Sequence, residues 1–404
     1  MKQSHFAVLT QMVNGHVYPV LPLCTELVRR GHRVTYVTNE HYANLISETG
    51  AEPVIVNTPR MPDDLKEEIK IGLPLPITDP RCKRMYNLWR AHFFCETTES
   101  LPEMKRFYLQ NVPDLILYDR YRIPGRILTK HLGVPAVQMS GHFAFHNGFA
   151  MRRSGVCENP DVIIEWSKDL DAFLSIFGIT SHGSYWHVED LNLYFIPKEF
   201  QHHNDCFDER FCFIGALLDR PFHAMWGDRP NSSPVILISG TALWDVEKID
   251  SREDFNMVVN ALSEVPYQCI LSLGNGEFSR QLPANFELNR RVSHLEILPH
   301  ALLSICHGGM TSTLEALYHG VPVLIIPEGE AGEEVAYRVE ELGLGVRLGK
   351  NLASVKTIRE TVVKMLTDDV LLKRVKHMQD VFRSSGGAKL AANRIEHYLA
   401  DQRC

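Results

Sequence analysis

The 404-residue chain has no strong excess of charge of either sign. Its 42 lysine and arginine residues stand against 49 aspartate and glutamate residues, which gives a net charge of −7 and a pI of about 6.3. A global basic field of the kind that holds nucleic acid or an anionic membrane is therefore absent, and we expect no nucleic-acid partner. No apolar run approaches membrane-spanning length, and Met1 to His5 lead into a strand pattern without a signal core. We therefore expect no stable membrane insertion and a cytoplasmic location.

The chain also lacks the short motifs of several common protein classes. Its nine cysteines are odd in number and have no C-x-x-C spacing, which indicates reduced thiols rather than a disulfide framework or a zinc site. The missing G-x-G-x-x-G and Walker A motifs argue against a dinucleotide dehydrogenase and an ATPase. No Asp-x-Asp or histidine–carboxylate cluster has convincing metal-ligand spacing, so we expect that catalysis requires neither a metal nor a cofactor.

What the sequence does have is a regular alternation of strand-like and helical patterns, which predicts parallel sheets covered by helices. A first series of strands is expected at residues 6–10, 33–37, 115–118 and 134–139, and a second at residues 235–239, 268–273, 302–306 and 321–326. Prolines at 221, 230 and 234 interrupt regular structure between the two series. The sequence thus predicts an α/β protein with Rossmann-like domains at residues 1–213 and 234–384, joined by a linker at residues 214–233.

The most informative motif follows the predicted strand at residues 302–306. Two glycines, Gly308 and Gly309, let backbone N–H groups approach an anion closely, and the helix that follows adds its unsatisfied donors and partial positive charge. Such a turn can hold a diphosphate without a metal. Glu315, one helical turn after Thr311, can accept hydrogen bonds from ribose hydroxyls. The remaining predicted donor-binding residues of this motif are His307, Ser312 and Thr313. Taken alone, these residues also fit an ordinary capped strand–turn–helix.

The run from His307 through Pro327 and on to Arg338–Gly345 resembles the donor signature of family 1 glycosyltransferases, most nearly the bacterial macrolide type. The resemblance extends from Gly15-His16 to Gly386-Gly387-Ala388, nearly the whole chain. It implies the GT-B fold, in which two Rossmann-like domains face each other across a cleft. It further implies that residues 1–213 bind the acceptor, that residues 234–384 bind the nucleotide sugar, and that a terminal helix at residues 385–404 packs back on the N-terminal domain.

A candidate reactive group lies in the N-terminal half. His16 follows the first predicted strand, and Asp119 ends another, so both are expected at the carboxyl edge of the same parallel sheet. A histidine there can take a proton from a hydroxyl near neutral pH when a carboxylate fixes its tautomer. The resemblance implies that these two residues form the catalytic dyad; without it, His16 also fits a loop histidine and Asp119 a turn residue. Asp114 precedes its strand, and we assign it a structural role at the opposite edge.

The resemblance implies a direct displacement at the anomeric carbon of the sugar, with inversion of configuration. His16 would deprotonate a hydroxyl, and the oxygen would attack opposite the diphosphate while the glycine-rich turn stabilises the leaving charge. The segment Ser239-Gly240-Thr241 ends the first strand of the second series and resembles the S-x-G-T loop of the family, which donates further hydrogen bonds to phosphate. As an isolated feature, it also fits a simple glycine turn.

Two departures from the family pattern concern the donor. Arg291-Val292 stands where relatives carry a Trp-x-Pro-Gln-like segment that binds the base, although Arg291 can stack on a pyrimidine. Ala331-Gly332 stands where relatives commonly place Asp-Gln to bind sugar hydroxyls, which puts glucose recognition in doubt. Either a deoxysugar or an N-acetylated sugar needs fewer contacts there, or Glu330 and Glu333 supply carboxylates from neighbouring positions. The resemblance favours uridine as the base, with thymidine as the alternative.

Acceptor contacts are expected in aromatic-rich stretches of the first domain, at residues 85–94 and 141–149. Such a wall suits an apolar polycyclic or macrocyclic acceptor. The candidate acceptor-binding residues are Trp89, Phe93, His142, Phe143 and Phe145. The alternative is that most of these aromatic residues belong to the core.

The sequence therefore predicts a nucleotide-sugar glycosyltransferase, monomeric or homodimeric, that modifies a small apolar hydroxylated molecule. One alternative is an epimerase or hydrolase of GT-B shape that acts on the nucleotide sugar itself. The other is a catalytically silent homologue that binds or activates a partner enzyme, against which His16, Asp119, His307 and Glu315 argue.

Overall fold

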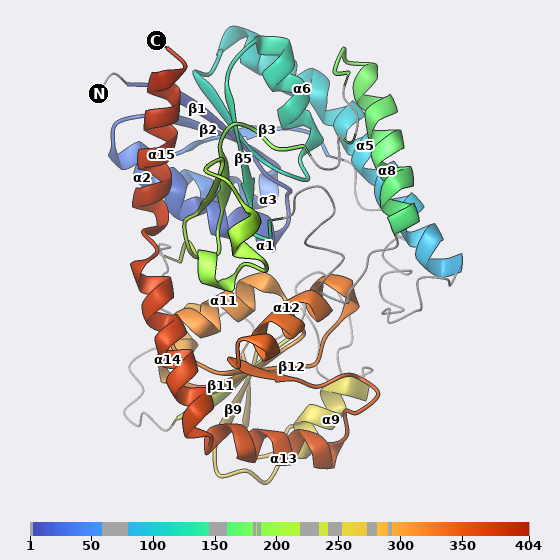
Figure 1. The fold of residues 1–404 in the computed structure, drawn as a ribbon, viewed down its shortest axis with the longest axis vertical. Helices are drawn as coiled ribbons and strands as arrows, with labels where there is room; N and C mark the ends of the chain where they lie inside the picture. The colour runs from blue at the N-terminus through green and yellow to red at the C-terminus, as the bar shows by residue number, and fades with distance from the viewer. Residues whose placement is uncertain are drawn as a thin grey trace. The chain divides into compact units, whose positions relative to one another are not determined.

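The structure is a computed structural model that describes residues 3–58, 80–144, 160–180, 183, 187–218, 234–240, 253–272, 281–289 and 293–403, except for the side chains of residues 80–90, 160–164, 253–254 and 330. The chain divides into two compact units (Figure 1). The first comprises Met1–Pro221 together with Ser385–Cys404, and the second comprises Phe222–Ser384. The linker predicted at residues 214–233 includes the point where the chain leaves the first unit, but residues 219–233 lie outside the described residues.

The first unit is built on a parallel sheet, seven-stranded among the described residues, with the strand order β3-β2-β1-β4-β5-β6-β7. Its central pair is β1 and β4, in which Leu9 lies opposite Tyr118. The strands are β1 (His5–Leu9), β2 (Arg33–Thr38), β3 (Glu52–Ile55), β4 (Leu115–Asp119), β5 (Ala136–Ser140), β6 (Asn192–Tyr194) and β7 (Phe211–Phe213).

Helices cover both faces of this sheet because successive residues of β1 point to opposite sides and all of them are buried. Phe6 and Val8 join a core that includes residues of α2 (Leu21–Arg29), α3 (Glu40–Ser47) and α15 (Gly387–Asp401). Ala7 and Leu9 join a second core with α5 (Pro80–Gln110), α6 (Ile123–Leu132) and α8 (Pro160–Ser175). Short helical turns complete the unit: α1 (Asn14–Val17), η1 (Tyr18–Val20), η3 (Lys198–Phe200) and η4 (Asn204–Cys206).

The second unit repeats this topology with a parallel sheet of six described strands in the order β10-β9-β8-β11-β12-β13. Its strands are β8 (Val235–Ser239), β9 (Gln268–Ser272), β10 (Phe286–Asn289), β11 (Ala301–Cys306), β12 (Val323–Ile325) and β13 (Gly345–Arg347). Its helices are α9 (Glu253–Leu262), α10 (His294–Ile297), η6 (Leu298–His300), α11 (Met310–Tyr318), α12 (Gly329–Glu341), α13 (Val355–Leu366) and α14 (Asp369–Ser384). The prediction of two Rossmann-like α/β units is confirmed.

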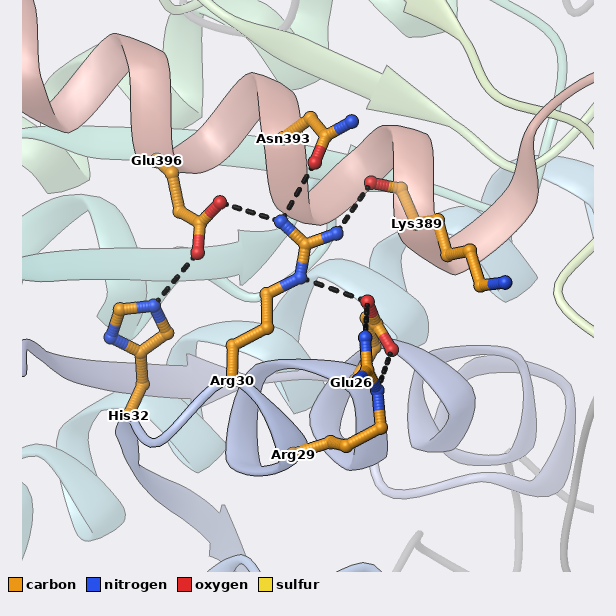
Figure 2. A network of polar contacts seen from close by, with 7 residues as sticks. All are labelled: Glu26, Arg29, Arg30, His32, Lys389, Asn393 and Glu396. Atoms are coloured by element: carbon orange, nitrogen blue, oxygen red, sulfur yellow. Dashed lines mark hydrogen bonds and ion pairs between the residues drawn. The ribbon is translucent and has the colours of Figure 1, made fainter. Parts of the chain in front are cut away.

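The helix α15 belongs to the first unit although it follows the second in sequence. It packs on α2. The side chain of Arg30, the residue just after α2, donates hydrogen bonds to residues of α15 (Figure 2). Arg30 Nη1 donates to Glu396 Oε2 at 2.6 Å and to Asn393 Oδ1 at 2.7 Å, while Nη2 donates to the Lys389 carbonyl at 3.2 Å. On the side of α2, Arg30 Nε donates to Glu26 Oε1 at 2.8 Å. One guanidinium group therefore joins two helices that lie more than 350 residues apart in the sequence.

Both oxygens of the buried Glu396 carboxylate are bound in this contact. Its second oxygen, Oε1, lies 2.9 Å from Nε2 of His32, whose Nδ1 accepts a hydrogen bond from the Ser4 backbone N–H. Because Nδ1 is an acceptor, Nε2 carries the proton and donates to Glu396. At the other end of the network, hydrogen bonds from Arg29 lower the pKa of Glu26. Burial opposes this effect, hydrogen bonds from Arg30 add to it, and the resulting pKa is about 2. The Glu26 carboxylate, which holds Arg30 in place beside α15, therefore stays ionised across the neutral range.

We predict that Glu396→Ala loosens α15 selectively. The substitution removes the only charged group of α15 that this network gives to Arg30 and His32, while Arg30 keeps Glu26 on the side of α2. Breaking a buried ion pair costs about 3 kcal/mol, so amides in α15 should exchange with solvent roughly a hundredfold faster. Hydrogen exchange followed by mass spectrometry measures this. The matched control is Arg29→Ala, which removes an ion pair whose arginine side chain is 64% exposed and which should change α15 protection far less. Equal effects of the two substitutions would contradict the anchoring role of Glu396.

Candidate functional site

His16 and Asp119 meet at the carboxyl edge of the first sheet, as the sequence predicts. Asp119 is the last residue of β4, and His16 lies in α1, which follows β1. Because β1 and β4 are parallel neighbours, their carboxyl ends lie side by side. His16 Nδ1 lies 2.6 Å from Asp119 Oδ2, and the two side chains are 16% and 6% exposed. The two residues thus form a short, largely buried hydrogen bond between parts of the chain 103 residues apart.

The second oxygen of Asp119 fixes the role of each group in this pair. Oδ1 accepts a hydrogen bond from the Tyr121 backbone N–H at 2.8 Å. Burial alone would raise the pKa of Asp119, but the His16 ring and this backbone donor outweigh burial and lower it. An ionised carboxylate can only accept, so His16 Nδ1 carries the proton and Nε2 is left with a lone pair. That nitrogen is available to accept a proton from a substrate.

The same contact tunes the basicity of His16. Burial acts to lower the pKa of His16, whereas the charge of Asp119 and its hydrogen bond raise it, and the net result is a pKa above the ordinary value of 6.5. A histidine with these properties is a stronger base than one in water.

Two rings and one amide complete the surroundings of the pair. Tyr121 lies edge-on to His16, with ring centroids 6.1 Å apart, and His142 lies 5.5 Å from His16. Gln11, in the loop that leads to His16, donates from Nε2 to the Tyr121 carbonyl at 2.7 Å and so ties the two strand ends together. Sequence reasoning had singled out neither Gln11 nor Tyr121. The available signal was their position at strand ends: Gln11 directly follows the strand predicted at residues 6–10, and Tyr121 lies three residues beyond the one at residues 115–118.

Asp114 occupies the opposite edge of the sheet, as its place before β4 implied. Its carboxylate accepts hydrogen bonds from the His5 backbone N–H at 2.7 Å and from Arg403. These contacts tie β1 to the residues that follow α15. The structural role assigned to Asp114 agrees with its position.

The predicted acceptor-binding aromatic residues have different surroundings. Phe93 on α5 stacks against Trp166 on α8, with centroids 6.1 Å apart, and both line a cavity of about 50 Å³ that Tyr121 also borders. Phe143 is only 3% exposed and stacks on Phe200, so its ring is core rather than an open wall. The side chain of Trp89, and Phe145 as a whole, lie outside the described residues. Of this set, Phe93 is near the Asp119 turn and His142 is beside His16.

In the second unit, His307, Gly308 and Gly309 connect β11 to α11, as predicted. The His307 ring lies against Gly309, where an added Cβ would come within 2.7 Å of Nε2. No side chain caps the start of α11, so the first backbone N–H groups of this helix remain available to donate hydrogen bonds. Ser239 ends the adjacent strand β8 and Gly240 follows it, while Thr241 lies outside the described residues. The turn therefore has the open helix start that an anion site requires.

The hydroxyl residues at the start of α11 are not equivalent. Thr311 and Ser312 are partly exposed, and Ser312 Oγ donates to the Gly309 carbonyl at 3.1 Å. Thr313 is fully buried, and its hydroxyl lies 3.9 Å from Cys306 Sγ. The prediction that Thr313 binds the donor through its side chain therefore does not agree with its position, because this fourth residue of α11 faces inward.

The Ala331-Gly332 segment has a packing reason that the sequence did not reveal. Gly308 has φ of +88°, and a Cβ added to it would lie 2.5 Å from the Gly332 carbonyl oxygen. A Cβ on Gly332 would in turn lie 2.6 Å from the His307 carbonyl oxygen. The start of α12 and the glycine turn thus touch backbone to backbone, a distance that only two glycines allow. A glutamine in place of Gly332 would require the turn to move.

The neighbouring carboxylates are engaged to different degrees. Glu333 accepts a hydrogen bond from Arg347 Nε at 2.6 Å, so it already serves an ion pair within the unit. The side chain of Glu330 lies outside the described residues, as do Arg291 and Val292. Ala331 is exposed at the start of α12. Of the described residues considered for sugar contacts, Ala331 is exposed, whereas Gly332 is buried and Glu333 is partly buried.

Glu315 is buried and lies near a histidine that sequence reasoning did not assign to the site. Its Oε2 is 3.3 Å from His294 Nδ1, and His294 Nε2 is 3.1 Å from Ser272 Oγ at the end of β9. His294 therefore lies between the end of β9 and the carboxylate. Its position directly after the Ser293 N-cap of α10 was the signal that could have found it.

Within the part of the chain that the structure describes, no group of three or more histidine, cysteine, aspartate or glutamate side chains is placed to hold a metal ion. Among the described helices, none combines the length and apolar character needed to cross a bilayer.

Comparisons with known proteins show which family has this arrangement. Residues 256–388 match the family described as the C-terminal domain of erythromycin biosynthesis protein CIII-like proteins. The chain is 33% identical over 412 residues to the NDP-glycosyltransferase YjiC of Bacillus subtilis (strain 168), covering 99% of this chain and 98% of that protein. The chain belongs to the family 1 natural-product glycosyltransferases. It is 28% identical to the oleandomycin glycosyltransferase of Streptomyces antibioticus, over 98% of this chain and 91% of that one.

Solved structures agree with this family. The calicheamicin glycosyltransferase CalG4 matches with a TM-score of 0.79 and 29% identity, over 99% of both chains. The kitacinnamycin glycotransferase matches with a TM-score of 0.81 and 26% identity, over 99% of this chain and 100% of that one. The two Rossmann-like units are therefore those of a GT-B glycosyltransferase, and the enzyme is a sugar transferase.

We predict that Gly332→Ala destabilises this glycosyltransferase, because the added methyl group meets the His307 backbone and not a flexible side chain. Overpacking of this kind typically costs about 1 to 3 kcal/mol. Thermal unfolding should show a lowered transition for the second unit. Ala331→Ser, at the exposed neighbouring position, is the control and should leave the transition in place. A Gly332→Ala protein as stable as the control would mean that the close contact relaxes at little cost.

Proposed function

We propose that this glycosyltransferase moves a sugar from a nucleoside diphosphate donor, with uridine favoured as the base, to a hydroxyl of a small apolar natural product. The observation that carries this proposal is the 2.6 Å hydrogen bond between His16 Nδ1 and the buried Asp119 carboxylate. It leaves Nε2 as a base at the carboxyl edge of the first sheet. The names of two relatives, an oleandomycin glycosyltransferase and a demethyllactenocin mycarosyltransferase, support an acceptor of the natural-product class.

The proposed reaction is one displacement that inverts the anomeric centre. His16 Nε2 takes the proton of the acceptor hydroxyl, and the oxygen forms a bond to the anomeric carbon as the bond from that carbon to the diphosphate oxygen breaks. Asp119 remains ionised and stabilises the imidazolium that forms, as a carboxylate does in a serine protease triad. The proton leaves His16 for solvent after transfer.

The leaving diphosphate is assigned to the second unit. The turn from His307 to Gly309 and the uncapped start of α11 offer backbone N–H groups and the positive end of the helix to an anion. Ser239, the last residue of the neighbouring strand β8, and Gly240 after it lie at the same edge of the sheet. These groups can stabilise the charge on the diphosphate without a metal, so we propose that transfer needs neither a divalent cation nor a cofactor.

The acceptor is assigned to the first unit. Phe93, Trp166 and Tyr121 line the cavity of about 50 Å³ next to the Asp119 turn, which is large enough for only a small part of an acceptor, and His142 lies beside the base. Aromatic side chains of this kind suit a ring system that carries few polar groups.

The first test compares wild type with His16→Ala, using UDP and TDP forms of glucose, N-acetylglucosamine and a 6-deoxysugar, with EDTA present and a panel of hydroxylated polycyclic and macrocyclic acceptors. The proposal expects transfer of one sugar with inversion. His16→Ala should lower turnover by at least a hundredfold and leave nucleotide binding, measured by calorimetry, unchanged. Donor breakdown that ignores the acceptor would favour a hydrolase or epimerase, and equal turnover by the variant would remove His16 as the base.

The pH dependence provides a second test. Only neutral His16 can accept a proton, and its pKa lies above 6.5. We therefore expect kcat/KM to rise with pH through the pKa of His16 and then to level off. In Asp119→Asn, the charge and hydrogen bond that raise this pKa are lost while burial still lowers it. The rise should therefore move to lower pH, and the plateau should fall by about 10²- to 10⁴-fold because the tautomer is no longer fixed. A rise that stays in place would show that Asp119 does not set the proton affinity of His16.

A further inference from the structure

A second histidine shares the surroundings of the base. His142 lies two residues after β5, the strand that pairs with β4, and its backbone N–H donates to Ser140 Oγ at 3.1 Å. Its ring centroid is 5.5 Å from that of His16, at an interplanar angle of 47°. Tyr121 lies edge-on to both histidines, with centroids 6.1 Å from each. The carboxyl ends of three adjacent strands thus bring three rings together.

The charged and titratable groups that face His142 are His16, Asp119, Arg120 and Tyr121. Burial is the largest influence on the pKa of His142, and the positive charges of His16 and Arg120 act in the same direction. The Asp119 carboxylate opposes them but is already bound to His16, and the pKa of His142 falls to about 4. At neutral pH, His142 is therefore an uncharged imidazole with one N–H donor and one lone pair.

We propose that the reacting hydroxyl of the acceptor is held between the two histidines, with His142 donating a hydrogen bond to the same oxygen that His16 deprotonates. This inference rests on the proposed function and assigns to His142 a contact with the reacting atom. A centroid separation of 5.5 Å allows one oxygen atom to reach a nitrogen of each ring.

The two histidines then have opposite tasks. The O–H bond breaks as the proton passes to His16 Nε2, and the oxygen gains negative character before it bonds to the anomeric carbon. His142 keeps its own proton and stabilises that negative character through its N–H donor, as a neutral histidine can do toward a developing oxyanion. A protonated His142 would instead repel the imidazolium that forms on His16. The neutrality of His142 is thus part of its role.

The test uses His142→Phe and His142→Gln. Phenylalanine keeps an aromatic ring but has no donor, so kcat should fall by about a hundredfold, the effect of losing one oxyanion donor. Glutamine restores an N–H and should recover roughly tenfold of that loss. Because His142 does not titrate in this range, the rise of kcat/KM with pH should keep its position in the glutamine variant. His131→Phe and His131→Gln, made at an exposed histidine on α6, are the matched controls and should behave as wild type.

A measurement independent of turnover tests the charge. Imidazole ¹⁵N spectra of the free protein, assigned by comparison with His142→Gln, should show His142 neutral from pH 5 to 8 while His16 titrates above 6.5. A His142 signal that titrates near 6.5, a phenylalanine variant with wild-type kcat, or a glutamine variant no better than phenylalanine would each overturn the inference.

The variants of His16 and His142 together distinguish an error in the role of His142 from an error in the proposed function. If His16→Ala retains full turnover, or if wild type breaks down the donor without an acceptor, the proposed base chemistry fails whatever His142 does. If His16→Ala is inactive while His142→Phe is fully active, the base assignment holds and the role of His142 alone is wrong.

Discussion

Parallel strand pairing is the constraint on which the rest of this protein depends. In each unit all described strands run in one direction, so their carboxyl ends lie at the same edge of the sheet. Residues separated by a hundred positions in the sequence are brought together there. His16 and Asp119 follow β1 and β4, and the glycine turn and Ser239 follow β11 and β8. The β1–β4 register sets the distance at which the base meets its carboxylate.

At this edge, the chemistry depends on which groups are charged. A buried carboxylate is costly unless its oxygens are satisfied, and Asp119 uses both of them, one for His16 and one for the Tyr121 backbone. The resulting negative charge raises the proton affinity of one histidine, while burial and nearby positive charge suppress that of the other. Two residues of the same type thus acquire different proton affinities although their rings lie 5.5 Å apart, and this difference fits the acid–base roles assigned to them.

The sequence predicted those parts of the protein that local periodicity and strand ends determine. The eight strands with strong apolar runs are all present, because each is buried on both faces. Strands such as β10 and β13, half-buried at the sheet edge, give a much weaker pattern and were not singled out. In the site, the positions of His16 and Asp119 followed from the topology. The burial of Thr313, the core position of Phe143 and the proximity of His294 to Glu315 depend on tertiary packing, which a single sequence does not encode locally. The contact between Gly308 and Gly332 also depends on tertiary packing. In the sequence, Gly308 indicated only an anion-binding turn, and Gly332 indicated only the loss of a sugar-binding side chain.

The position of α15 has a consequence for how the protein is made. Ala391, Ala392, Ile395 and Leu399 complete one of the two cores of the first unit, yet they are synthesised after the whole of the second unit. Until they emerge from the ribosome, the apolar face beneath α15 has no covering helix. A nascent first unit therefore exposes an apolar, aggregation-prone surface while the second unit is being translated. Its core is completed only late, by contacts between residues far apart in the sequence. The unit that begins first in the sequence is therefore the last to be completed.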